Sequence, residues 1–211
     1  MPRDVVVWSA QPQQAALISC PVFEILFGGA RGGGKTDGVL GDFIVHADQW
    51  QEHAIGLMIR RTRTELVETI ERSKQIYYPF AVYHTQESMW RFNNGARLRF
   101  AYLERDADAD AYQGHSYTRI YPEEIGNFPS PTPILKLMAT LRSGAGVPCG
   151  LRATGNPGGP GHQWVKARYR LDTNPNGMEV YRFEFTNPFT KKKIEKTRVF
   201  IPSKVVDNKY L

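Results

Sequence analysis

The sequence has little of what a secreted or membrane-spanning protein needs. No apolar run reaches the roughly 20 residues of a membrane-spanning helix, and the N-terminus lacks the basic-then-apolar layout of a secretion signal. The two cysteines, Cys20 and Cys149, are too few for a disulfide framework, so we expect two buried thiols in a reducing compartment. The five histidines show no metal-ligand spacing.

The composition fits one large globular domain. Of the 211 residues, 41% are apolar and 12% are aromatic, which is enough to build a core. Lys and Arg total 27 against 21 acidic residues, a net charge of +6. This excess permits contact with a phosphate backbone but does not by itself indicate one, because many soluble domains carry a similar surplus.

Strand-like and helix-like segments alternate along the chain. Strands are predicted at 22–27, 54–59, 117–121, 151–154, 180–186 and 199–201, and helices at 35–47, 62–80, 131–143 and 162–169. Two further alternating runs, at 89–92 and 96–102, flank Asn93-Asn94-Gly95 and predict a β-hairpin. This order favours an α/β fold with a mostly parallel sheet, flanking helices and an added antiparallel hairpin.

A glycine-rich loop follows the first predicted strand and precedes the first predicted helix. Its sequence is Gly29-Ala30-Arg31-Gly32-Gly33-Gly34-Lys35-Thr36, which matches the phosphate-loop pattern G-x-x-x-x-G-K-[ST]. Glycines let successive backbone N–H groups point at an anion, and the helix presents its positive end to it. We expect Lys35 to bind the β- and γ-phosphates and the Thr36 hydroxyl to bind Mg²⁺. Arg31 is either an exposed loop residue or a second cation for the γ-phosphate.

Two adjacent glutamates follow a later predicted strand. A hydrolysing P-loop protein needs one carboxylate at a strand end for Mg²⁺ and a base that orients water. We assign Glu123 to Mg²⁺ and Glu124 to water activation. In isolation the pair could be two surface glutamates that open a loop, and the phosphate loop upstream favours the catalytic interpretation.

Polar residues at two other places suit nucleotide sensing. Thr154-Gly155-Asn156 follows a predicted strand, where a hydroxyl and an amide could detect the γ-phosphate; the alternative is a β-turn that needs Gly and Asn for backbone reasons. Gln14 lies before the first strand and could bind adenine, or could belong to a polar turn. The run Lys191–Lys193 could contact DNA, although most such runs are solvated.

Taken together and in this order, the phosphate loop, the two glutamates and Thr154-Gly155-Asn156 resemble the ATPase domain of phage large terminase subunits, the motors that package DNA into capsids. Four further stretches resemble that family: Ile59-Arg60-Arg61-Thr62, Tyr112-Gln113-Gly114-His115, Asn127-Phe128-Pro129-Ser130-Pro131 and Val199-Phe200-Ile201-Pro202. The resemblance covers nearly the whole chain.

The resemblance implies a RecA-like P-loop fold of the ASCE (additional strand, catalytic glutamate) type, with ATP and Mg²⁺ as ligands. It implies double-stranded DNA, a portal protein, a small terminase subunit and a homo-oligomeric ring as partners, with a monomer as the alternative in isolation. The protein would be located in the host cytoplasm, where it would dock transiently on the procapsid. Glu124 would be the catalytic glutamate, and Thr154 to Asn156 would couple hydrolysis to movement.

Three features depart from that family. Glu123 stands where aspartate is usual, so the longer side chain must be accommodated. Gln113 stands where some relatives carry an arginine that acts on a neighbour's ATP, and Arg60, Arg61 or Arg105 could substitute. Complete large terminases continue into an RNase H-like nuclease domain with clustered aspartates. We expect 1–202 to be the ATPase domain and 203–211 to begin a linker, with no nuclease activity in this chain.

Three kinds of function compete at this point. The leading hypothesis is ATP hydrolysis that drives double-stranded DNA into a viral capsid. A P-loop small-molecule kinase would transfer the γ-phosphate to a metabolite instead of water. The third is a non-catalytic DNA-binding or assembly module with a degenerate nucleotide site. Another P-loop ATPase or helicase remains an alternative within the first kind.

Overall fold

The computed structural model describes residues 8–30, 32–187 and 190–203. The strands of this part form one sheet in the order β3-β4-β5-β2-β6-β7-β1-β9-β8. Their bounds are β1 Glu24–Gly29, β2 Ile55–Arg60, β3 Ala81–His84, β4 Met89–Phe92, β5 Arg97–Tyr102, β6 Arg119–Pro122, β7 Gly150–Gly155, β8 Tyr181–Thr186 and β9 Lys193–Ser203.

The centre of the sheet is parallel and both edges are antiparallel. Strands β5, β2, β6, β7, β1 and β9 pair in parallel, whereas β3 and β4 extend one edge and β8 the other in antiparallel pairing. The expected α/β fold with a mostly parallel sheet and an added hairpin is therefore confirmed. Because parallel strands end on the same side, the loops after β1, β2, β6 and β7 meet at one edge.

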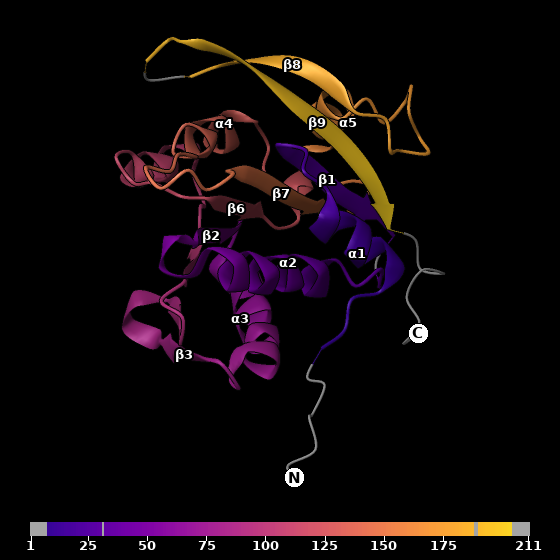
Figure 1. The fold of residues 1–211 in the computed structure, drawn as a ribbon. Coiled ribbons are helices and arrows are strands. Elements are labelled where there is room, and N and C mark those ends of the chain that lie inside the picture. Colours follow the sequence, from indigo (N-terminus) through magenta and orange to yellow (C-terminus); the bar gives the residue numbers. More distant parts are fainter. Residues whose placement is uncertain (1–7, 31, 188–189, 204–211) are drawn as a thin grey trace.

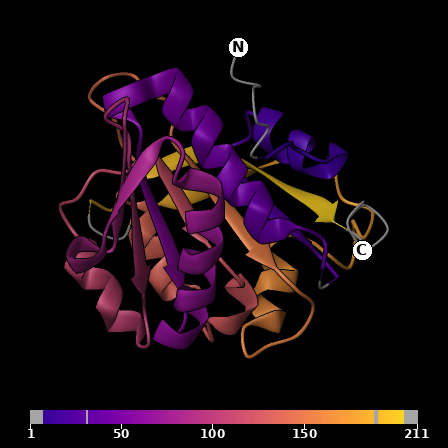
Figure 2. The same cartoon turned by 90° about the horizontal axis from the view of Figure 1, so that it is seen from below.

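Helices cover both faces of the sheet (Figure 1). The α-helices are α1 Pro12–Ser19, α2 Lys35–Trp50, α3 Arg63–Tyr77, α4 Thr132–Met138 and α5 His162–Arg168. Figure 1 shows α1, α2 and α3 on one side of the sheet and α4 and α5 on the other, and Figure 2 looks onto the side with α1, α2 and α3. No helix of the described part has the length and apolar character to cross a membrane.

Each face has its own core of buried side chains. On the side of α2 and α3, Phe43 and Tyr77 belong to one core with Trp90 of β4 and Leu98 of β5. The core on the side of α4 and α5 is built from residues that include Ile120, Ile134, Leu137, Leu151 and Val165. A central sheet with a core on each face explains why the predicted parallel strands read as nearly continuous apolar runs.

Several elements differ from their predicted bounds. The helix predicted at 62–80 ends at Tyr77, because Pro79 cannot continue it, and β3 follows where no strand was expected. The helix predicted at 131–143 ends at Met138, since the chain then leaves to pair Leu141 with Tyr117. Helix α1 was not predicted, although Pro12 at its first position is a helix-start signal.

A buried ion cluster ties the start of β1 to α5 and β9. Glu24 is fully buried and accepts hydrogen bonds from Arg168 at 2.7 and 2.9 Å and from Arg198 at 2.9 Å. Burial acts to raise the pKa of Glu24, but the two guanidinium groups outweigh it, so the pKa is lowered. The first strand, which leads into the glycine loop, is therefore held by charged contacts as well as by the sheet.

Candidate nucleotide-binding site

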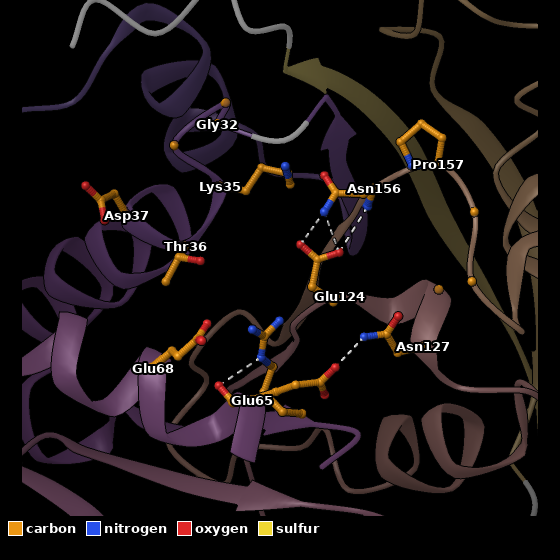
Figure 3. Close-up of a pocket in the computed structure, with 16 residues that line it drawn as sticks. Gly32, Lys35, Thr36, Asp37, Glu65, Glu68, Glu124, Asn127, Asn156 and Pro157 are labelled. Carbon is orange, nitrogen blue, oxygen red and sulfur yellow. Dashed lines mark hydrogen bonds between the residues drawn. The ribbon is translucent and has the colours of Figure 1, made fainter. Parts of the chain in front are cut away.

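A pocket of about 740 Å³ lies where the carboxyl ends of the parallel strands meet (Figure 3). The glycine loop and the start of α2 form one wall, and the end of β2, the start of α3 and the loops after β6 and β7 form the others. The lining residues are Gly32, Gly33, Gly34, Lys35, Thr36, Asp37, Arg60, Glu65, Glu68, Glu124, Gly126, Asn127, Asn156, Pro157, Gly158 and Gly159. Its volume suits a ligand of nucleotide size.

The glycine loop wraps around the Lys35 side chain. Gly34, the residue before α2, has φ +66°, a left-handed conformation that favours glycine. The Lys35 ammonium donates a 2.7 Å hydrogen bond to the Ala30 carbonyl and is only 7% exposed. Burial lowers the pKa of Lys35, while the carboxylates of Glu124 and Glu123 oppose that shift. The loop therefore presents a partly desolvated cation between a helix N-terminus and two acids, as phosphate binding requires.

Two further segments support this loop from behind. The Ser203 hydroxyl, at the end of β9, donates a 2.7 Å hydrogen bond to the Gly33 carbonyl. The Gln14 amide donates to the Gly34 carbonyl at 2.8 Å and accepts from the Gln11 N–H at 2.9 Å. Gln14 is 2% exposed and lies behind the loop, not in the pocket wall. Its predicted contact with adenine stays a prediction, and Arg31 lies outside the described residues.

Glu123 is buried between the loop helix and α3. It is 1% exposed. One carboxylate oxygen accepts a hydrogen bond from the Thr36 hydroxyl, and the other accepts from Thr69 at 2.5 Å and lies 3.5 Å from Arg60 Nε. Glutamate is long enough to reach from the end of β6 to Thr69 on α3, which is how the structure accommodates a side chain longer than aspartate.

The contact between Thr36 and Glu123 suits a magnesium ion. A hydroxyl and a carboxylate are hard oxygen donors, and Mg²⁺ is usually held by one or two carboxylates together with phosphate oxygens and water. Within the ranges that the structure describes, no group of three or more His, Cys, Asp or Glu side chains could hold a metal ion. The donor set therefore fits a magnesium bound jointly with a nucleotide and not an all-protein metal cage.

Glu124 points toward Asn156, the residue that follows β7 (Figure 3). Its carboxylate accepts hydrogen bonds from the Asn156 side-chain amide at 2.8 and 2.9 Å and from the Asn156 N–H at 3.2 Å. Its own N–H donates to the Thr154 hydroxyl at 3.0 Å. Glu124 has φ +50°, a left-handed conformation that costs a non-glycine residue about 1 to 2 kcal/mol. From the sequence, Thr154 and Asn156 could detect the γ-phosphate. The structure shows both residues hydrogen-bonded to Glu124.

The three candidate arginines lie in different surroundings. Arg60 lines the pocket and is 9% exposed. Arg61 pairs with Asp106 at 3.4 Å, and Arg105 pairs with Asp108 at 3.4 Å with its own side chain 83% exposed. Of these three, only Arg60 is near the predicted phosphate position in this chain.

Sequence reasoning missed two supports of the site. Thr69 was read only as part of a helix, and Asn127 only as part of a stretch that resembles a family. Asn127 donates a 2.7 Å hydrogen bond to Glu65, whose other carboxylate oxygen accepts from the Thr62 N–H at 3.2 Å (Figure 3). The signal for Glu65 was its capping-box position, three residues after Thr62.

Comparisons with known proteins place this geometry in context. No family model matches the sequence, and no curated protein sequence is significantly similar to it. The large terminase of a thermophilic bacteriophage superposes with a TM-score of 0.67 and 17% identity, over 97% of this chain and 48% of that one. The same protein in complex with ATP-γ-S gives a TM-score of 0.66 at 17% identity, over 96% and 47%.

A shorter protein matches over nearly its whole length. The N-terminal domain of the DNA packaging ATPase from bacteriophage phi29 gives a TM-score of 0.58 and 13% identity, over 89% of this chain and 93% of that one. This chain spans about half the length of the large terminase from the thermophilic phage. Its fold is the P-loop fold seen in phage large terminases and in the N-terminal domain of a phage DNA packaging ATPase.

Proposed function

We propose that this chain is the ATPase domain of a large terminase motor, which hydrolyses ATP to drive double-stranded DNA into a viral capsid. The observation that carries the proposal is the arrangement around Glu124. Asn156 holds the Glu124 carboxylate and Thr154 holds its backbone N–H, and Glu124 lines the same pocket as Lys35 and Thr36. The shared fold with phage DNA packaging proteins supports the same conclusion.

Each residue has a separate task in the proposed hydrolysis. Lys35 binds the β- and γ-phosphates, and the loop N–H groups bind the remaining phosphate oxygens. Thr36 and Glu123 would hold Mg²⁺, which would supply positive charge against the phosphate oxygens. Glu124 accepts a proton from the attacking water. Because Asn156 bonds to both Glu124 oxygens, a shift of the loop after β7 changes the position of the base.

The remaining parts of the proposal concern assembly. The motor would act as a homo-oligomeric ring with a portal protein and a small terminase subunit, in the host cytoplasm and docked transiently on the procapsid. An arginine from a neighbouring subunit would stabilise the negative charge that develops in the transition state. Alternatively, Arg31 or Arg60 of the same subunit would do so.

Glu124→Gln tests the proposal. It keeps the side-chain size and removes the base, so we expect ATP turnover to fall by about 10² to 10⁴-fold while a fluorescent ATP analogue still binds. Glu104→Gln, the same change on a surface segment outside the pocket, is the matched control and should keep wild-type turnover. Normal turnover in Glu124→Gln would refute its role. Transfer of the γ-phosphate to a metabolite would indicate a kinase, and no ATP binding at millimolar Mg²⁺ would indicate an assembly module.

A further inference from the structure

A second hollow, of about 580 Å³, lies at the opposite end of the sheet. Its lining includes Ile55 and Arg97, the first residues of β2 and β5, which pair with one another. The nucleotide pocket lies at the carboxyl ends of the same strands, and the two hollows share no lining residue. A ligand in this hollow would therefore be bound independently of ATP.

Arginines of β4 and β5 lie on one face of the sheet at this hollow. The alternation of β5 directs Leu98 and Phe100 into the core beside α2 and α3 and leaves Arg97 and Arg99 on the other face. Arg91 of β4 lies directly opposite Arg97 in the antiparallel pair. Like charges directly opposite each other destabilise a sheet, so the stability of the fold does not account for this arrangement.

These charges are only partly neutralised within the chain. Arg91 pairs with Glu87 at 2.8 Å. Neither the Arg97 nor the Arg99 side chain makes a hydrogen bond or an ion pair in the part of the chain that the structure describes. His115 lines the same hollow and is exposed. Glu87 also lines the hollow and interacts electrostatically with Arg99, so one carboxylate stands against three guanidinium groups and the excess charge is positive.

The rest of the hollow argues against a protein partner. Of its apolar lining side chains, Met89 and Tyr117 are 8% and 3% exposed and Ile55 is partly exposed, so charged and polar side chains, chiefly guanidinium groups, dominate the surface open to a ligand. The cores of protein interfaces are depleted of charge and rich in exposed apolar side chains, whereas nucleic-acid interfaces are polar and strongly positive. Guanidinium groups also match phosphate oxygens in geometry.

The spacing of the arginines suits a polymer of phosphates. Arg97 and Arg99 are two residues apart on one strand, so their Cα atoms are roughly 6.6 to 6.8 Å apart. Their side chains therefore offer two neighbouring cations to successive phosphates of a polymer. The exposed lining has no Phe, Tyr or Trp ring, since Tyr117 is buried, and stacking of single-stranded bases relies mainly on such rings. The remaining mode of binding is contact with the phosphate backbone of a duplex, without sequence preference.

We propose that Arg97 and Arg99, with Arg91 beside them, bind the phosphate backbone of double-stranded DNA. This proposal rests on the proposed function, because it names where the translocated duplex contacts the domain. The site lies away from the ATP pocket, so DNA binding and nucleotide binding are separable by mutation.

The test is the salt dependence of DNA binding by the whole chain, measured by fluorescence anisotropy with a labelled duplex. In Arg97→Ala/Arg99→Ala, the slope of log K against log salt should fall by about 2, and affinity at 0.1 M salt on the order of 50-fold, because each phosphate contact contributes about 0.9 to the slope. Arg97→Lys/Arg99→Lys keeps the charges and should retain most of the slope. Unchanged ATP-analogue binding in both variants would show that the fold is intact.

Lys191→Ala/Lys192→Ala is the matched control, since it removes two cations from the other basic candidate. An equal loss of affinity in this control would overturn the proposal in favour of general electrostatic attraction. Unchanged DNA affinity in the arginine variant, with altered self-association in sedimentation, would assign the face to a second copy of the chain. Loss of DNA affinity in a chain that does not hydrolyse ATP would leave this site standing and refute the proposed motor function.

Discussion

His46, near the C-terminal end of α2, should make the stability of the fold depend on pH. The side chain is 3% exposed, and its Nε2 lies 2.8 Å from the Thr118 hydroxyl. That hydroxyl donates to the Ile55 carbonyl and accepts from the Ile55 N–H, so we assign the proton of neutral His46 to Nε2, which donates to Thr118. His46 Nδ1 has no partner among the described residues. A second proton would therefore create a buried cation without an acceptor.

The charges around His46 work in the same direction. Burial comes first, and the guanidinium groups of Arg119 and Arg152 follow; together they lower the pKa of His46 to about 3. Asp42, which accepts a hydrogen bond from the Tyr121 hydroxyl, lies 3.6 Å from Arg119 and 3.8 Å from Arg152. Its charge offsets only part of theirs.

The lowered pKa makes stability depend on pH. In the unfolded chain His46 gains a proton below its ordinary pKa of 6.5, while in the folded chain it stays neutral down to about pH 3. Stability is therefore full above pH 6.5 and falls as the pH drops through the window between these values. At 1.36 kcal/mol per pH unit, the free energy of unfolding should fall by about 2 kcal/mol between pH 7 and pH 5.

Urea unfolding at pH 7 and pH 5, followed by tryptophan fluorescence, measures this loss. His46→Gln is the control, because its amide can still donate to Thr118 but takes up no proton in this range. The pKa of Glu24 is lowered from 4.5, so its contribution to stability is lost mainly below pH 4.5, outside the range from pH 7 to pH 5, and is the same in the control. An equal loss of stability in wild type and His46→Gln would refute the assignment.

Three further predictions concern the nucleotide site. Asn156→Ala removes the amide that holds Glu124, and turnover should fall by up to about 10²-fold with ATP-analogue affinity nearly unchanged. Thr69→Val removes one of the two hydroxyl hydrogen bonds to buried Glu123 and should lower the free energy of unfolding by about 1.5 to 3 kcal/mol in urea; Thr69→Ser should recover most of it. Gly34→Ala should cost about 1 to 2 kcal/mol in the same assay because of its positive φ, and a wild-type midpoint would contradict that interpretation.

Predictions about the fold succeeded where the signal was local in sequence. Asn93-Asn94-Gly95 predicted the hairpin, and its turn has Gly95 at φ +90°. The strand β3 was missed because it is four residues long and lies at the sheet edge, where pairing with β4 stabilises it more than composition does. The full 11 residues of β9 were missed for a similar reason, since charged residues at its start pair with β8 in the open.

The residues of the candidate site could be predicted where they belong to short sequence motifs. The structure brings Lys35, Thr36, Glu123, Glu124 and Asn156 together, although their roles stay predictions. Contacts between distant segments were not predictable, because nothing in a single sequence indicates which helix faces a strand end. The Thr69 bond to Glu123 and the Ser203 bond to the glycine loop are of this kind.

Glu123 and Glu124 contact different parts of the fold because the backbone pairing of β6 and β7 stops before the two strands end. Their register extends only to Ile120 and Leu151, so the carboxyl ends of these strands are not joined by a ladder of backbone hydrogen bonds. Side chains take over there, with Glu124 bound to Thr154 and Asn156. Glu123 is instead held by helices α2 and α3. Movement of the end of β7 relative to β6 would therefore reposition Glu124, the proposed base, while Glu123, the proposed magnesium ligand, stays in place.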